Sequence, residues 1–171
     1  MLQPLARATW APIGETPILP QWERRDRLTG IAAVALDPCG GDLDLYFQLL
    51  PRNARFHDFI CFLRELRDEL RRDLIVVWDR LAAHRKADGL LTELDCDWVH
   101  MEYLPPYCPD LNPVEHVWST TKWNHRPNWP PDDITAVYDG VEHSLTNQAT
   151  DEYLLESHFD WAGLDLSDIR S

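Results

Sequence analysis

Residues 74–79 read LIVVWD, and this short stretch decides the fold class of the chain. It contains no polar residue from Leu74 to Trp78, and such a continuous apolar run is typical of a strand buried on both faces of an α/β sheet. Asp79 follows at the carboxyl end of that strand. Because α/β sheets bind ligands at the carboxyl ends of their strands, Asp79 is the first candidate site residue.

A second acid, Glu115, stands in the first turn of a predicted helix. Asn112 is placed as the N-cap of this helix and Pro113 as its first residue, which are the positions these residue types favour. The 35 residues between the two acids are enough for a helix, a strand and a loop. We therefore expect both carboxylates at one edge of the sheet, as two hard oxygen ligands.

Both acids also have ordinary structural explanations. Glu115 stands three residues after its N-cap, which is the spacing of a capping box, where the Glu side chain bonds back to the N-cap amide. Asp79 could cap the helix that begins near Leu81, or could pair with Arg80 or Arg85. Neither explanation requires a metal, so the residue types alone leave these alternatives open.

Two histidines stand near these acids in the sequence. His84 lies five residues after Asp79, and His116 is adjacent to Glu115, so each is a candidate proton carrier or additional ligand, although a lone histidine is more often structural. The remaining histidines show no metal-ligand spacing such as HExxH, which argues against a zinc hydrolase. The sequence also contains no P-loop, GxGxxG or GxSxG motif.

The rest of the chain is predicted to alternate strands and helices. A loose hairpin is expected over 1–20, and an antiparallel strand pair over 28–36 and 43–48. Apolar residues at helical spacing predict helices over 56–70, 82–94, 114–121 and 134–145, a short helical piece at 153–155, and irregular chain from 159 onward. A strand over 97–104 follows the second of these helices, which implies a right-handed parallel crossover.

Length and composition predict a single domain over residues 1–171. The chain is 44% hydrophobic and has eight tryptophans, enough for a substantial core. No apolar run approaches the ~20 residues of a membrane span, and the N-terminus lacks a signal-peptide pattern. We therefore expect a cytoplasmic protein that has no membrane partner. The four cysteines form no CxxC pair and are expected to be reduced and mostly buried.

The charge pattern gives only weak support for nucleic-acid binding. The net charge is −13, whereas phosphate binding depends on lysine and arginine. The segment 52–86 carries a net +3, and interleaved acids there favour ordinary surface pairing. The segment 131–171 carries a net −9 and is expected to present a solvated helical face. The weak DNA-binding candidates are Arg64, Arg67, Arg71, Arg85 and Lys86.

Longer phrases of the sequence carry a family resemblance. IVVWDRLAAHR (75–85) and WVHMEYLPPYCPDLNPVEHVWSTTK (98–122) resemble the catalytic core of DDE transposases of the mariner superfamily, specifically the bacterial insertion-sequence branch numbered six-thirty. Asp79, Asn112 and Glu115 match the motifs of that family position for position. Further matching phrases are TWAPIGETPILP (9–20) and RPNWPPDDI (126–134).

This resemblance implies an RNase H-like fold, a mixed sheet flanked by helices, and metal-dependent phosphodiester cleavage and joining in DNA transposition. It implies Mg²⁺ or Mn²⁺ bound by Asp79 and Glu115, in a site where two ions ~3.5–4 Å apart flank the scissile phosphate. Asn112, His84 and His116 are then supporting residues. The resemblance also implies that the protein binds transposon-end DNA and forms a homo-oligomer. It implies a location at the bacterial nucleoid.

The chain also departs from the family pattern. The first catalytic Asp of the family lies on a strand just before the segment that matches 2–10, so the first strand is expected to be incomplete, and the first acid and the helix-turn-helix region to be absent from 1–171. Asp37 ends a strand but occupies the turn after the family's second strand, so it is not assigned to the site. Arg80 replaces a common Asn, and Cys108 a common Ser.

Three functions remain in competition at this point. The first is a catalytic-domain fragment of a transposase that is inactive alone. The second is a non-catalytic remnant that folds and binds a transposase partner. The third is an unrelated Mg²⁺-dependent phosphodiesterase built on the same two acids.

Overall fold

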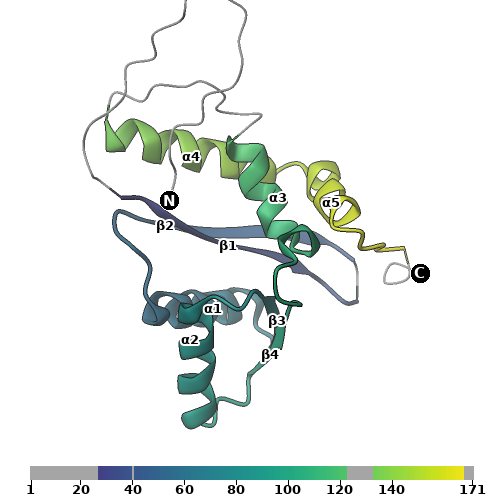
Figure 1. Cartoon of the computed structure of the whole chain (residues 1–171). Coiled ribbons are helices and arrows are strands. Elements are labelled where there is room, and N and C mark those ends of the chain that lie inside the picture. Colours follow the sequence, from purple (N-terminus) through teal and green to yellow (C-terminus); the bar gives the residue numbers. More distant parts are fainter. Residues whose placement is uncertain (1–26, 40, 123–132, 168–171) are drawn as a thin grey trace, which may run out of the picture.

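The structure, a computed structural model, describes residues 27–39, 41–122 and 133–167. The hairpin expected over 1–20 and most of the proline-rich link before residue 134 lie outside these ranges. The elements are β1 (Thr29–Leu36), β2 (Leu43–Leu50), α1 (Phe56–Leu70), β3 (Leu74–Trp78), α2 (Ala82–Glu93), β4 (Val99–Tyr103), the 3₁₀ turn η1 (Pro109–Leu111), α3 (Pro113–Thr120), α4 (Ile134–Ala149) and α5 (Glu152–Trp161) (Figure 1).

The described strands form two separate two-stranded sheets. β1 and β2 are antiparallel and their register is continuous from Thr29 opposite Leu50 to Leu36 opposite Leu43. β3 and β4 are parallel and are connected through α2, which confirms the predicted parallel crossover. The α/β class is therefore confirmed. Within the described residues, however, the mixed sheet consists of one antiparallel and one parallel pair that share no ladder.

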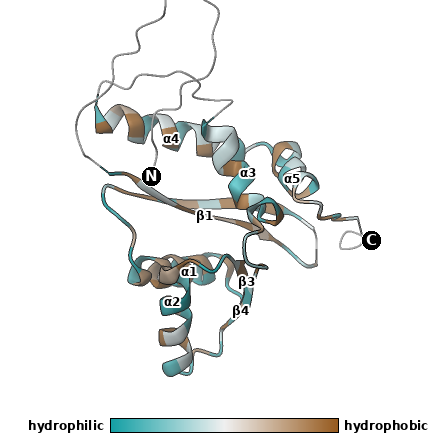
Figure 2. Ribbon diagram, in the orientation of Figure 1, coloured by the Kyte–Doolittle hydropathy of each residue, from teal (hydrophilic) through white to brown (hydrophobic). Residues whose placement is uncertain are grey.

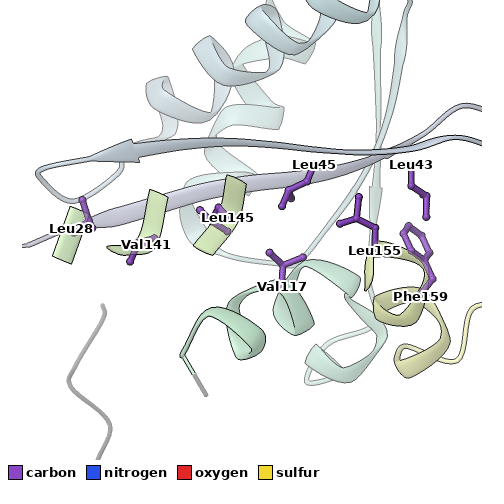
Figure 3. Packing of buried hydrophobic residues seen from close by; sticks show 8 residues of the cluster. All are labelled: Leu28, Leu43, Leu45, Val117, Val141, Leu145, Leu155 and Phe159. Atoms are coloured by element: carbon purple, nitrogen blue, oxygen red, sulfur yellow. The ribbon is translucent and has the colours of Figure 1, made fainter. Parts of the chain in front are cut away.

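Two hydrophobic cores lie on either side of the β1–β2 hairpin. The first is formed where α3, α4 and α5 pack on the hairpin, and the second where α1 and α2 pack on β3 and β4, with Ala33 and Tyr46 of the hairpin contacting it. Figure 2 shows the hairpin coloured as hydrophobic along much of its length, as expected for strands with helices near both faces. The buried side chains of the first core are Leu28, Leu43, Leu45, Val117, Val141, Leu145, Leu155 and Phe159 (Figure 3).

β3 is buried on one face only, so the prediction of burial on both faces was wrong for the described structure. Leu74 and Trp78 are buried, whereas Ile75 and Val77 are 76% and 58% exposed. The reason is that α3, α4 and α5 pack on the hairpin, and no described element covers the second face of β3. An apolar run in the sequence shows that a strand can be covered on both faces, but not which element covers it.

The two helices of the C-terminal acidic segment are longer than predicted. Asp133 and Asp151 cap α4 and α5 by accepting hydrogen bonds from Ala136 N–H (2.8 Å) and Leu154 N–H (3.0 Å). Asp139, Glu142, Asp151, Glu152 and Asp160 are exposed, which agrees with the predicted solvated face. The expected irregular chain begins at residue 162 and not at 159, because the buried side of α5 continues to Phe159 and the helix to Trp161.

The four cysteines are free thiols, as expected. Cys39 and Cys61 are exposed, and Cys96 and Cys108 are partly exposed, so the expectation of mostly buried thiols was wrong. Cys39 lies in the turn after β1, and Cys61 lies on the outer side of α1, where the sequence pattern places polar residues.

Gly30 of β1 allows the close approach of α3 to the hairpin. A Cβ atom at residue 30 would overlap the indole ring of Trp118. We expect Gly30→Ala to lower the free energy of unfolding by about 1–3 kcal/mol, because the ring must move in a packed core.

In α2, by contrast, a Cβ at residue 89 would meet no atom within 4 Å. Gly89→Ala should therefore raise stability by about 0.5–1 kcal/mol.

Urea unfolding followed by circular dichroism measures both glycine variants. Unchanged or increased stability of Gly30→Ala would contradict this account of how α3 packs on β1.

Candidate functional site

Asp79 lies directly after β3, and one of its carboxylate oxygens is held by two donors. Oδ1 accepts a hydrogen bond from the backbone N–H of Leu81 (2.9 Å) and lies 2.6 Å from Nδ1 of His84. Helix α2 begins at Ala82 with Leu81 as its N-cap, so Asp79 forms a turn before the helix and is not its capping residue. The Asp79 side chain is still 53% exposed. The strand end thus presents a carboxylate in a fixed orientation.

The His84 ring is held in place by aromatic neighbours. It stacks on Trp78 at 4.5 Å between ring centroids, with 4° between the planes, and meets Phe59 edge-on at 4.5 Å. Because a carboxylate oxygen can only accept, Nδ1 of His84 is the donor in the bond to Asp79. The structure therefore places His84 against Asp79, as a residue that orients the carboxylate.

Neither neighbouring arginine pairs with Asp79 in the described structure. The guanidinium of Arg80 lies 5.3 Å from the centroid of the Tyr103 ring, and its Nε donates to the carbonyl of Leu104 (3.4 Å). Arg85 is exposed on α2. The alternative that Asp79 serves as the ion-pair partner of Arg80 or Arg85 therefore lacks support from these contacts.

The parallel register brings the end of β4 next to Asp79. Trp78 lies opposite Tyr103, and the N–H of Leu104 donates to the carbonyl of Trp78 (2.9 Å). The chain that leaves β4 therefore starts at the sheet edge where Asp79 stands, and continues through η1 to α3. Asp79 and Glu115 are thus carried by segments that leave the same edge of the sheet.

The N-terminus of α3 is capped without the Glu115 carboxylate. The side chain of Asn112 accepts from Val114 N–H (3.1 Å), as predicted for an N-cap. The N–H of Asn112, which a capping box would bond to Glu115, instead donates to the carbonyl of Pro109 (2.9 Å). The capping-box explanation of Glu115 was therefore wrong. Glu115 is exposed, and within the described part of the chain its carboxylate has no hydrogen bond or ion pair.

The other predicted site residues lie elsewhere. The ring of His116 packs against Trp161 of α5, with 5.6 Å between ring centroids, and its Nε2 is buried without a partner among the described residues. The structure therefore places His116 in the contact between α3 and α5, whereas Glu115 is exposed. Asp37 accepts hydrogen bonds from Cys39 N–H and Arg72, which explains it as a turn residue.

Two of the five predicted basic residues make described side-chain contacts. Arg67 pairs with Asp73 (3.3 Å) and lies over the ring of Trp98, and Lys86 lies over Phe56. Arg71 ends α1 in the left-handed conformation, with φ 52°. Of the five candidates, Arg64, Arg71 and Arg85 are therefore exposed residues whose side chains have no such described contact.

Sequence reasoning missed a buried polar cluster behind α3. It consists of Thr121, Ser144, Gln148 and His158, which are 0–1% exposed. A signal was present, because Ser144 and Gln148 fall on the apolar stripe of α4 at helical spacing from Val141. Polar residues on such a stripe indicate buried hydrogen bonds, but the stripe does not identify their partners.

Comparisons with known proteins identify the fold and the family of the chain. Two solved structures are similar, each with 18% sequence identity: a Mos1 strand transfer complex (TM-score 0.55, covering 94% of this chain and 46% of that chain) and a Mos1 transposase paired-end complex with left transposon end (TM-score 0.57, 92% and 47%). This chain thus spans just under half the length of those proteins. The similarity confirms the RNase H-like α/β fold.

No curated protein sequence matches the chain significantly. The family model of the DDE superfamily endonucleases, however, matches residues 2–137, which is most of the chain. The chain therefore belongs to the DDE superfamily endonucleases.

Proposed function

We propose that this chain carries two of the catalytic acids of a DDE transposase, an enzyme that cleaves and joins DNA phosphodiesters. The observation that carries this proposal is the state of the two carboxylates. Asp79 is presented at a strand end with one oxygen held in place, and Glu115 is exposed and not used in its helix cap. Both acids lie within the matched family region.

We infer that Asp79 and Glu115 bind Mg²⁺ or Mn²⁺. The donor set fits such an ion, because Mg²⁺ takes one or two carboxylates and completes its shell with water and phosphate oxygens. Only Oδ1 of Asp79 is committed to described hydrogen bonds, so its second oxygen remains for a ligand. When bound, divalent ions would stabilise the charge that develops on the attacking and leaving oxygens of the phosphate.

The residues around the two acids fix their directions. His84 and the N–H of Leu81 hold Asp79, and the bonds of Asn112 hold the first turn of α3. The positive end of the α3 dipole also favours an anionic carboxylate in that turn. Carboxylates that are already oriented lower the free-energy cost of binding a metal ion, because their side chains lose little further conformational freedom when the ion binds.

We propose that a third carboxylate reaches this site from a strand outside the described residues. Among those residues no group of three or more metal-ligating side chains occurs. β3 has a described ladder partner on one edge only, so a further strand can pair with its other edge and end beside Asp79. In the family, the first Asp lies on such a strand.

The proposed substrate is transposon-end DNA, which the Mos1 paired-end complex contains. The exposed residues Arg64, Arg71 and Arg85 are the best of the candidate phosphate contacts, although the net +3 of their segment is weak. A homo-oligomer and a nucleoid location belong to the same proposal. None of the described helices has the length and apolar character needed to cross a membrane.

The second candidate function is a non-catalytic partner of a complete transposase. The exposed residues Ile75 and Val77, together with the single ladder of β3, favour it, because an uncovered apolar strand can pair with a strand of another chain. An unrelated phosphodiesterase is disfavoured by the family match.

We expect Mn²⁺ at 100 times its dissociation constant to stabilise the chain by about 2.7 kcal/mol, since a ligand that binds only the folded state shifts the unfolding equilibrium. Thermal unfolding with and without Mn²⁺ measures the shift. Asp79→Asn combined with Glu115→Gln should abolish it, whereas the charge-matched change Asp68→Asn with Glu69→Gln, on the exposed side of α1, should not. An equal shift in the first double variant would place the metal elsewhere.

A further inference from the structure

The buried polar cluster lies behind α3, and the proposed metal site does not explain it. Thr121 ends α3, Ser144 and Gln148 lie on α4, and His158 lies on α5. All four side chains are almost completely buried. A polar side chain in an apolar core is costly unless it is hydrogen-bonded, so the arrangement of these bonds is informative.

The bonds of the cluster have a fixed direction. The carbonyl of Val117 can only accept, so the amide nitrogen of Gln148 faces α3, donating to that carbonyl (3.4 Å) and to Thr121 Oγ1 (2.9 Å). The amide oxygen of Gln148 then faces α5, where it accepts from Nε2 of His158 (3.1 Å). Ser144 Oγ also donates to Thr121 Oγ1 (3.1 Å). Three helices are thus joined in one defined arrangement.

The cluster holds the side of α3 opposite Glu115. With about 100° of rotation per residue, Val117 and Thr121 lie roughly 200° and 240° around the helix from Glu115. Glu115 therefore projects from the exposed side of a helix whose opposite side is bonded to Gln148. Any rotation of α3 about its axis that turns Glu115 away also breaks the bonds to the Val117 carbonyl and Thr121.

We propose that Gln148 and His158 are positioning residues that set the direction of Glu115. His158 orients the amide of Gln148, and Gln148 fixes the rotation of α3. This inference rests on the proposed role of Glu115 as a metal ligand. It explains why polar groups are retained in this core, because apolar contacts tolerate several helix rotations, whereas directed hydrogen bonds are satisfied in one.

The remaining described contacts of α3 are a cap at its first turn and packing contacts, which include the buried Val117 and the ring of His116 against Trp161. Packing contacts define a rotation less sharply than directed hydrogen bonds do. Asn112 caps the first turn, and Trp118 lies against Gly30 in the middle of the helix. The helix has only eight residues, so its own length supplies little rigidity. The polar cluster is the described set of hydrogen bonds that ties its last turn to α4 and α5.

The test is the dissociation constant of Mn²⁺, measured at neutral pH from the electron paramagnetic resonance signal of the free ion. Gln148→Leu should raise this constant about tenfold, the loss typical when a residue that orients a metal ligand is removed. His158→Leu should have a similar effect. His158→Gln, which keeps an N–H donor toward Gln148, should bind Mn²⁺ nearly as the unchanged chain does.

The matched control is Val141→Ala, a change in the same helix and core that removes no hydrogen bond to α3. It should lower the melting temperature and leave the Mn²⁺ dissociation constant unchanged. If Gln148→Leu and His158→Leu fold and their Mn²⁺ dissociation constants are unchanged, the positioning role is wrong. It is also wrong if Val141→Ala raises the Mn²⁺ dissociation constant by the same factor as these two variants. If Gln148→Leu does not fold, the contrast between His158→Leu and His158→Gln decides.

The same experiment separates this inference from the proposed function. If the unchanged chain binds no Mn²⁺, or binds it equally well after Glu115→Gln, the metal site itself is wrong and the positioning role falls with it. If binding depends on Glu115 but not on Gln148 or His158, only the positioning role is wrong.

Discussion

The 171-residue chain is expected not to nick a labelled transposon-end duplex in Mg²⁺, whereas a chain extended at its N-terminus by the family's Asp-bearing strand is expected to nick it. Among the described residues no group of three or more metal-ligating side chains occurs, so the structure shows no third acid beside Asp79 or Glu115 there. Two adjacent divalent ions would then have too few carboxylates to offset their charge. Because catalytic groups that act as a unit are grossly non-additive, losing one should cost about 10³-fold or more in rate.

The matched control for this cleavage assay is the extended chain with Glu115→Gln, which should lose nicking while it remains folded. The extended chain with the charge-matched pair Asp68→Asn and Glu69→Gln should keep it. Robust nicking by the 171-residue chain that disappears in its Glu115→Gln variant would contradict the expectation. A further acid would then complete the site, and Asp37→Asn would be the first variant to measure.

Local patterns in the sequence predicted most of the strands and helices. The alternation in 43–48 and the helical spacing from Phe56 to Leu70 each depend on one face of one element meeting a core, which is a local property of the sequence. The pairing of these elements is not local. The separation of the strands into two pairs depends on which edges find partners, and residues 74–78 contain no information about that.

The candidate site was predicted in part for the same reason. The sequence placed Asp79 at a strand end and Asn112 at a helix cap, because both depend on immediate neighbours. It could not decide whether Glu115 belongs to a capping box, since the spacing is the same in either case. The structure decides this through the carbonyl of Pro109, which takes the Asn112 N–H.

The polar cluster could not be predicted because its bonds join residues far apart in the chain. Gln148 bonds to Thr121 and to His158, which are 27 and 10 residues away. A polar residue on an apolar stripe indicates that such partners exist. Their identity follows only from how α3, α4 and α5 pack on the hairpin.

His158 should make the stability of the folded chain depend on pH between about 4 and 6.5. Burial of the imidazole, and to a lesser extent the nearby charge of His116, lowers the pKa of His158 to about 4. In the unfolded chain the pKa of a histidine is about 6.5. The unfolded state therefore binds a proton in this range that the native state does not, and the free energy of unfolding must fall as the pH falls.

The total loss attributable to His158 is about 3.5 kcal/mol, because its pKa falls from 6.5 to about 4 and each pKa unit corresponds to about 1.4 kcal/mol. Urea unfolding at a series of pH values measures it, and His158→Gln, which cannot be protonated, should remove that part of the slope. The effect is separable from that of Asp58, whose pKa is lowered to about 2 by hydrogen bonds from Arg52 and then from the Arg55 backbone. That group loses its contribution only below about pH 4, so an unchanged slope between pH 4 and 6.5 in His158→Gln would show that His158 is not held neutral in the core.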